Sequence, residues 1–195
     1  AVSPAPTPTV KTGGGVSEHG KLHVQGTQLC DEHGAAVELH GMSSHGIQWF
    51  PQYTTKQAIA NTAAYGANLF RVAMYTGEGG YLSSPAQIKK AAYAAMDAAI
   101  ENDMYVIIDW HILSDGDPLT HLKEAQALVK TIRSNAPDSI ILIGSGTWSQ
   151  DLQDPAADPV VGTNLMYTCH FYAGTHGAWL RQRIADAQKR GLAVF

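Results

Sequence analysis

The sequence predicts an α/β fold of the (β/α)-barrel type that is incomplete, with about six of the eight strands of a full barrel. Nearly continuous apolar runs alternate with segments of helical periodicity. Continuous apolar runs are typical of strands buried on both faces, as in a parallel sheet covered by helices. In addition, polar or aromatic residues stand at the carboxyl ends of most runs, where barrels place their working residues.

The strand-like runs share a high content of Val, Ile, Leu, Met and Phe. They cover residues 36–42, 68–74, 104–110, 139–144, 165–171 and 192–195. Two shorter runs precede them, 22–24 and 28–30, and Gly26 between them favours a hairpin turn.

Four helices are expected between these strands, at 56–65, 85–101, 120–134 and 177–190. Thr54 or Thr55 is a suitable N-cap for the first, and Gly66 follows its end. In the second, Ser84 can cap and Pro85 suits the first helical position. Its apolar residues recur on one face, namely Ile88, Ala92, Ala95, Met96 and Ala99.

A doubly wound parallel sheet is the alternative architecture for this pattern. A dinucleotide-binding glycine fingerprint would favour it, but none follows the first strand. The Gly77–Gly80 stretch has neither the spacing nor the lysine of a phosphate-binding loop. The barrel is therefore preferred.

Composition narrows the class of partner. The net charge is −4 and charged residues make up 15% of the chain, with no run of Lys or Arg. This composition argues against nucleic acid and against a membrane surface as the binding partner.

Residues 1–20 begin with a Pro/Thr stretch and a Gly run, which predicts a linker ahead of a domain at 21–195. Linkers of this kind often join modules of exported polysaccharide-degrading proteins, so the expected location is extracellular.

The residues at the strand ends suit a neutral sugar. They are His45, Trp49, Arg71, Tyr75, Asp109, His111, Trp148, His170 and Tyr172. Aromatic faces stack on a pyranose ring, while imidazole, guanidinium and phenol groups bond its hydroxyls. A metal site built from His45, His111 and His170 is the rival hypothesis, but no His-x-His pair or His-Glu-x-x-His helix is present. No cofactor and no metal are expected.

Five segments resemble bacterial family 5 glycoside hydrolases, the endoglucanase-type cellulases, in the same order along the chain. They are GMSSHGIQW at 41–49, FRVAMYTGEGGY at 70–81, YVIIDWHILSDGDP at 105–118, GSGTWSQD at 144–151 and HFYAGTHG at 170–177. The resemblance covers nearly everything from residue 21 to residue 195. It implies a retaining endo-β-1,4-glucanase lineage whose partner is a β-glucan, either cellulose or a cello-oligosaccharide.

The same resemblance assigns roles to single residues. Arg71 would support the nucleophilic carboxylate, His111 and His170 would contact the sugar or the acid/base, and Tyr172 would bond near the nucleophile. The glucan cleft would be lined by His45, Trp49, Tyr75 and Trp148.

Both catalytic glutamates of the family are expected to be absent. Family members place one glutamate in an Asn-Glu-Pro motif at the end of the fourth strand and a second at the end of the seventh. The six glutamates here stand elsewhere, at Glu18, Glu32, Glu38, Glu78, Glu101 and Glu124. Asp109, Asp115 and Asp117 occur in the family beside its glutamates, so structural or loop roles are favoured for them. No residue is therefore assigned a catalytic role.

Two losses account for the missing glutamates. Residues 120–126 resemble the start of one family helix and 128–137 the end of a later one, so one βα repeat of roughly 30 residues is missing between them. The join keeps helical phase, with Leu122, Ala125, Val129 and Ile132 on one face. The chain also stops at Phe195, within what resembles the seventh strand.

Three functional hypotheses remain. The first is an endoglucanase-type domain that is inactive as the sequence stands, and the second is a non-catalytic carbohydrate-binding remnant. The third, a metal-dependent hydrolase, is the least favoured. A barrel that lacks strands leaves edges unpaired, so self-association is a further expectation.

Overall fold

The structure is a computed structural model that describes residues 11–111 and 122–195. The chain divides into two compact units, and each is described by itself. The first unit comprises Ala1–Lys21 and Ala35–Asp115, and the second comprises Leu22–Gly34 and Gly116–Phe195.

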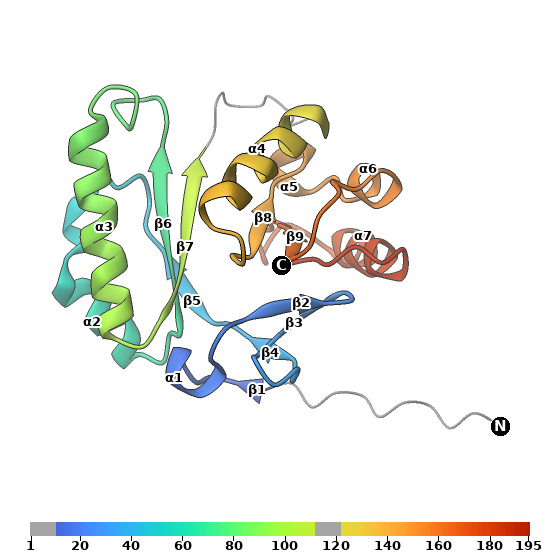
Figure 1. Cartoon of the computed structure of the whole chain (residues 1–195), viewed down its shortest axis with the longest axis horizontal. Helices are drawn as coiled ribbons and strands as arrows, with labels where there is room; N and C mark the ends of the chain where they lie inside the picture. The colour runs from blue at the N-terminus through green and yellow to red at the C-terminus, as the bar shows by residue number, and fades with distance from the viewer. Residues whose placement is uncertain (1–10, 112–121) are drawn as a thin grey trace. The chain divides into compact units, whose positions relative to one another are not determined.

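A three-stranded parallel sheet forms the centre of the first unit. Its order is β5 (Gly41–Ser43), β6 (Leu69–Tyr75) and β7 (Tyr105–His111). The connections run through α2 (Lys56–Ala64) and α3 (Pro85–Glu101), which lie on one side of the sheet (Figure 1). Parallel strands joined through helices are the arrangement that the continuous apolar runs predicted.

Alternation along β6 separates the core from the other face of the sheet. Phe70, Val72 and Met74 are buried in a cluster that includes Ile88 of α3. The predicted apolar face of α3 is nearly correct. The alanines at 92, 95 and 99 are buried as expected, but Met96 is only half-buried and Ala98 takes a fully buried position.

The predicted boundaries of α2 and α3 follow local signals. Thr55 caps α2, since its Oγ1 accepts a hydrogen bond from the Ala58 N–H at 3.3 Å. Gly66 follows α2 with a φ of 93°, a conformation that suits glycine. Pro85 occupies the first turn of α3 as predicted, but the Ser84 side chain makes no capping hydrogen bond, so that part of the prediction is wrong.

The amino-terminal part of the first unit holds several short elements. They are β1 (Lys11–Thr12), α1 (Val16–His19), β4 (Val37–Glu38) and the 3-10 helix η1 (Pro51–Thr54). β1 pairs in parallel with β4. The run predicted as one strand at 36–42 is thus interrupted between β4 and β5. The structure also places β1 and α1 within residues 1–20, the segment expected to be a linker.

The second unit contains a smaller parallel sheet. β8 (Ile141–Ile143) pairs with β9 (Leu165–Tyr167), and Val194 forms a parallel bridge to Tyr167 on the other side of β9. Helices α4 (Leu122–Asn135) and α7 (Ala178–Lys189) belong to this unit. β8, β9 and the bridge correspond to the last three predicted runs.

The predicted hairpin also belongs to the second unit. β2 (His23–Gln25) and β3 (Gln28–Cys30) are antiparallel, and Gly26 has a φ of 62°. Two short helices, α5 (Gly146–Ser149) and α6 (Gln153–Ala157), follow β8 and were not predicted.

Helix α4 is continuous across residues 126–128, where the sequence predicted a join between two family helices. Ala125 and Val129 are buried in the core of the second unit, as the helical phase required. Ile132, expected on the same face, is 39% exposed, so this part of the prediction is wrong.

The edge of the first sheet shows incomplete burial. Within the described residues, β7 is bonded to β6 alone. Ile108 and Trp110 are 43% and 49% exposed, whereas Val72 and Met74, which stand opposite them on β6, are buried.

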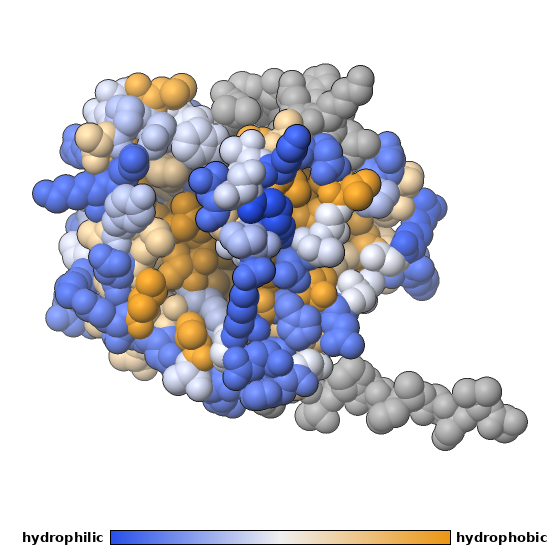
Figure 2. Space-filling model, in the orientation of Figure 1, coloured by the Kyte–Doolittle hydropathy of each residue, from blue (hydrophilic) through white to orange (hydrophobic). Residues whose placement is uncertain are grey.

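The surface seen in Figure 2 is largely hydrophilic, and hydrophobic residues form patches among the hydrophilic ones. None of the helices in the described part of the chain has the length and apolarity that a membrane span needs.

Candidate sugar-binding site

The register of β6 and β7 brings several candidate residues together in the first unit. Ala73 stands opposite Asp109, and Tyr75 stands opposite His111. Because side chains alternate along a strand, Arg71, Ala73 and Tyr75 share the face of β6 opposite to that of Phe70, Val72 and Met74. The small Ala73 leaves room between the two larger neighbours.

A compact polar network fills this face. Arg71 Nη2 donates to Asp109 Oδ2 at 2.6 Å, and His111 Nδ1 lies 2.8 Å from the same oxygen. Arg71 Nη1 donates to Ser43 Oγ at 2.7 Å. The three charged or titratable side chains of the network are only 20% to 27% exposed. Arg71 and His111 both contact the Asp109 carboxylate, and these two contacts hold the three side chains in a defined geometry.

Three hydrogen bonds, two between backbone groups and one to the Ser44 hydroxyl, attach the loop after β5 to the end of β6. Ser44 N–H donates to the Arg71 carbonyl at 2.9 Å, and the Ser44 hydroxyl accepts from the Ala73 N–H at 2.9 Å. Ile47 N–H donates to the Ala73 carbonyl at 3.2 Å. These bonds continue the sheet pairing past β5. They fix the backbone position of His45, which lies between the bonded residues Ser44 and Ile47, and of Trp49, which follows them.

An aromatic row centred on Tyr75 results. The Tyr75 ring centroid is 4.3 Å from that of His111 and 4.7 Å from that of Trp49. His45 lies nearly parallel to Tyr75 at 6.1 Å and tilted against Trp49 at 5.2 Å. Trp49 remains 38% exposed, so part of this residue is accessible to a ligand.

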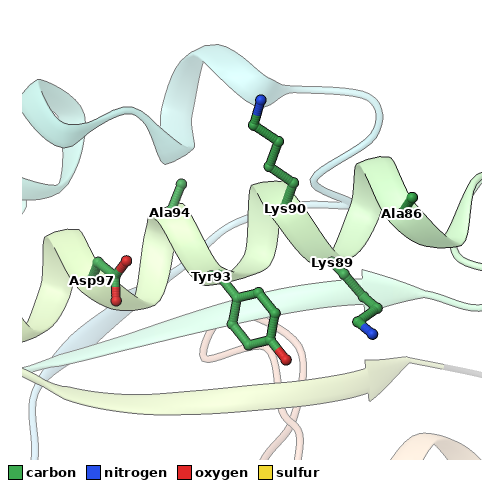
Figure 3. A pocket seen from close by; sticks show the side chains of 6 residues that line it. All are labelled: Ala86, Lys89, Lys90, Tyr93, Ala94 and Asp97. Carbon is green, nitrogen blue, oxygen red and sulfur yellow. The ribbon is translucent and has the colours of Figure 1, made fainter.

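A pocket of about 360 Å³ opens on this row, and we refer to it as the first-unit pocket. Its lining is Ser43, Ser44, His45, Arg71, Ala73, Tyr75 and His111. A second hollow of about 530 Å³ runs along α3, where Figure 3 shows its six lining residues. All six come from one helix and only Tyr93 is aromatic, so this hollow has no opposing wall to hold a sugar ring.

In the second unit, Trp148 lies in α5, which has left-handed rather than regular helical backbone angles and forms a turn after β8. Thr147, Trp148 and Ser149 have φ values of 52°, 51° and 62°, which is the left-handed region. For residues other than glycine this conformation costs about 1–2 kcal/mol each. The Trp148 side chain is 68% exposed.

Asp151 holds this turn. Its Oδ2 accepts from the Thr147 hydroxyl at 2.5 Å, and its Oδ1 accepts from Arg183 Nη1 at 2.7 Å. The Thr147 hydrogen bond, with smaller contributions from Gln153 and Arg183, lowers the pKa of Asp151 below its ordinary value. The guanidinium of Arg183 also lies 5.0 Å over the Trp179 ring.

His170 and Tyr172 follow β9 in the same unit. Both are exposed, and Tyr172 is 75% exposed. The Tyr172 N–H donates to His176 Nδ1 at 2.7 Å, and the two rings stack with centroids 5.9 Å apart. His176 is therefore a neighbour of the predicted site that the sequence analysis did not single out.

The structure thus places the eight predicted site residues in two groups. The first unit brings five of them together, and the second unit carries Trp148, His170 and Tyr172. Ser43 and Ser44, which the sequence analysis did not single out, join the first group. Asp109, which it named at a strand end but gave no role in the site, joins as well. The spacing of Asp109 and His111, two apart on one strand, was the available signal. Within 11–111 and 122–195, no group of three or more His, Cys, Asp or Glu could hold a metal ion.

Comparison with known proteins identifies the relatives of this chain. The cellulase family, glycosyl hydrolase family 5, matches residues 30–127 and 119–195. Endoglucanase 5 of Pectobacterium carotovorum is 39% identical over 92% of this chain and 43% of its own length. An endoglucanase of Clostridium saccharobutylicum is 38% identical over 90% of this chain and 48% of its own length. The chain spans about half the length of these relatives.

These comparisons also bear on the expected join. The alignment with Endoglucanase 5 covers 223 positions, whereas the chain has 195 residues. Because only 92% of the chain takes part in this alignment, about 44 of the 223 positions face no residue here. In addition, residues 119–127 belong to both matched pieces of the family. Both facts are what a chain that lacks an internal segment near α4 would give.

Solved structures agree on the fold. The catalytic domain of an endoglucanase from Thermobifida fusca superposes with a TM-score of 0.83 at 32% identity, covering 92% of this chain and 73% of that one. A halotolerant family 5 cellulase from an Icelandic hot spring isolate gives a TM-score of 0.84 at 31% identity, covering 94% of this chain and 73% of that one. The predicted (β/α)-barrel class with an incomplete strand set is confirmed, and the chain belongs to glycosyl hydrolase family 5.

Proposed function

We propose that these 195 residues bind a β-1,4-glucan chain, cellulose or a cello-oligosaccharide, and do not hydrolyse it at a normal rate by themselves. Within this proposal, residues 21–195 are the partial glycosidase domain. The observation that carries the binding is the aromatic row around Tyr75, which lies beside the Arg71–Asp109–His111 network. Neutral sugars are recognised by this combination of flat apolar faces and fixed hydrogen-bonding groups.

The relatives support the substrate class. An endoglucanase catalytic domain from Thermobifida fusca, similar to this chain at 32% identity, has been solved in complex with cellotetraose. In this chain Trp49, Tyr75, His45 and Trp148 are proposed to contact the glucan. Arg71, His111, His170 and Tyr172 are proposed as residues that support the reaction in a complete family member.

The expected lack of hydrolysis follows from the carboxylates. Retaining glycosidases need two carboxyl groups about 5–5.5 Å apart, one of them available as an acid. The carboxylate in the first-unit network, Asp109, is paired with Arg71 and His111 rather than free to transfer a proton to a sugar. None of the six glutamates in the sequence follows Asn and precedes Pro.

Binding and hydrolysis are tested separately. Calorimetric titration with cellohexaose is expected to show saturable binding that weakens in Trp49→Ala. Tyr65→Ala is a matched control, since Tyr65 is 94% exposed at the end of α2 and its loss should leave binding unchanged. No binding to wild type at millimolar oligosaccharide would refute the proposal.

Reducing-sugar release from carboxymethylcellulose is expected to be absent for the 195-residue chain. It should appear when the βα repeat and the carboxyl-terminal strands of a family 5 relative are grafted onto the chain. Robust hydrolysis by the chain alone would show that another carboxylate has taken over the chemistry.

The edge of β7 makes self-association part of the proposal. Exposed apolar strand edges tend to pair with other chains, and Ile108 and Trp110 are half-exposed there. Light scattering after gel filtration is expected to show a concentration-dependent increase in mass that Ile108→Lys reduces. A monomer at all concentrations would contradict it.

The Pro/Thr- and Gly-rich composition of residues 1–20 supports the proposal that the protein is exported. Fractionation of the producing cells would test this location.

A further inference from the structure

Two histidines of the first-unit pocket have different hydrogen-bonding partners at the same ring atom. The Nδ1 of His45 lies 2.8 Å from the backbone N–H of Gly46. The Nδ1 of His111 lies 2.8 Å from Asp109 Oδ2. A neutral imidazole carries its proton on one nitrogen only, and the partner of one nitrogen determines the role of the other.

His45 must accept at Nδ1. A backbone N–H can only donate, so the nitrogen that faces it carries a lone pair. The proton of the neutral ring then resides on Nε2, which makes Nε2 of His45 a hydrogen-bond donor.

His111 must donate at Nδ1. The carboxylate that faces it is paired with Arg71 and accepts only, and two acceptors at 2.8 Å would repel each other. Arg71 Nη2 also lies 3.1 Å from Nδ1, but its shorter contact, at 2.6 Å, is its hydrogen bond to the Asp109 oxygen. The closer carboxylate therefore determines the role of Nδ1, which bears the proton. Nε2 of His111 is left with the lone pair.

We propose that Asp109 is a positioning residue that fixes His111 as the hydrogen-bond acceptor of this pocket, opposite in tautomer to the donor His45. The centroids of the two imidazoles lie 6.1 Å and 4.3 Å from that of Tyr75, and both rings line the pocket. A sugar hydroxyl both donates and accepts, so two neighbouring hydroxyls of one glucose unit can satisfy both rings. The sugar as ligand rests on the proposed function, whereas the assignment of the two tautomers does not depend on it.

The test is long-range ¹H–¹⁵N NMR of the full chain with ¹⁵N-labelled histidine, recorded without sugar. The signals are assigned with His45→Gln and His111→Gln. Wild type is expected to show His45 protonated at Nε2 and His111 protonated at Nδ1. Finding both rings in the same tautomer would overturn the proposal, and this measurement needs no further variant to fold.

Asp109→Asn provides the second measurement. An amide can donate to Nδ1, and in serine proteases the same exchange leaves the histidine in the wrong tautomer. His111 is expected to change to the Nε2-protonated form while His45 stays unchanged, and cellotetraose binding should weaken about tenfold. Asp97→Asn, which removes an exposed carboxylate of α3 (Figure 3), should change neither readout.

The two proposals fail in different ways. An unchanged His111 tautomer in Asp109→Asn would refute the role of Asp109 even if the variant bound sugar poorly. Wild type with the expected tautomers but no cellotetraose binding would refute the proposed function and leave the role of Asp109 in place.

Discussion

The two units of the chain hold their aromatic side chains by different physical means. In the first unit, Tyr75 is set by strand register and Trp49 by a loop hydrogen-bonded to β6. In the second unit, Trp148 stands on a left-handed turn of three residues that Asp151 holds through a hydrogen bond to Thr147. The first arrangement uses hydrogen bonds between two separate segments of the sheet. The second combines backbone hydrogen bonds within residues 145–151 with one side-chain carboxylate, that of Asp151.

This difference determines how each site should respond to damage. Strain of about 1–2 kcal/mol per left-handed residue persists only where surrounding contacts over-determine it. The first-unit pocket has no comparable strain among Arg71, Tyr75 and His111, and its weak point is instead a partly buried charge. Removing the partner of that charge should therefore have the larger effect.

Arg71→Met is expected to have the largest effect. It leaves the Asp109 carboxylate, only 20% exposed, with His111 as its remaining partner, at a cost of about 2–3 kcal/mol in the free energy of unfolding. Urea denaturation measures that loss, and cellohexaose titration should show a parallel loss of binding. Lys89→Met, an exposed lysine of α3, is the control. An Arg71→Met variant as stable as wild type would mean that the network is not the weak point of this unit.

Trp49→Ala and Trp148→Ala are expected to weaken cello-oligosaccharide binding by about 1 kcal/mol each. They should differ in stability. Trp49 packs against Tyr75 and His45, so its removal should lower the melting temperature, whereas Trp148 is 68% exposed and should not. Equal melting temperatures for the two variants, measured by calorimetry, would remove the contrast between the units.

Asp151→Asn is expected to loosen the Trp148 turn and to cost about 1 kcal/mol, since the amide is a weaker acceptor for Thr147 and Arg183. Hydrogen exchange of the amides at 147–149 measures the loosening directly. Asp186→Asn is a suitable control, because Asp186 is exposed on α7 of the same unit. Unchanged exchange in Asp151→Asn would mean that something other than Asp151 holds the turn.

The pH dependence should be the smallest effect. Because its hydrogen bonds lower the pKa of Asp151 in the folded chain, the stability that it contributes is present above the ordinary range of aspartate. That contribution is lost as the pH falls through the lower, folded value. Screening by solvent should keep it to about 0.5 kcal/mol. Wild type should therefore lose more stability than Asp151→Asn between pH 6 and pH 3, in chemical denaturation at each pH.

Most of the fold could be predicted from the sequence because its signals are local. Apolar runs, Thr55, Pro85 and Gly66 mark where elements begin and end. Met96 and Ile132 were placed wrongly on buried faces, since a helical wheel does not reveal how far the neighbouring elements cover each face. The interruption between β4 and β5 likewise depends on pairing partners rather than on residue type.

The candidate site was predictable in its residue types but not in its pairings. His111 and Arg71 were expected to serve a sugar site, but that they share Asp109 follows only from the register of β6 and β7. The left-handed turn at Trp148 had no signal in the sequence, since Thr147, Trp148 and Ser149 are neither glycine nor asparagine. Strain of this kind is set by the surrounding contacts.

The uninterrupted helix α4 has a consequence for how such chains change over evolution. A helix satisfies its backbone hydrogen bonds within itself, so two helices cut at the same phase can be fused without leaving a donor or acceptor unpaired. A deletion bounded by two helices therefore spares local folding and transfers its whole cost to strands elsewhere, such as the edge of β7. In a repeat architecture, the middle of a helix is therefore a position where removal of a unit need not leave a backbone group without its hydrogen bond.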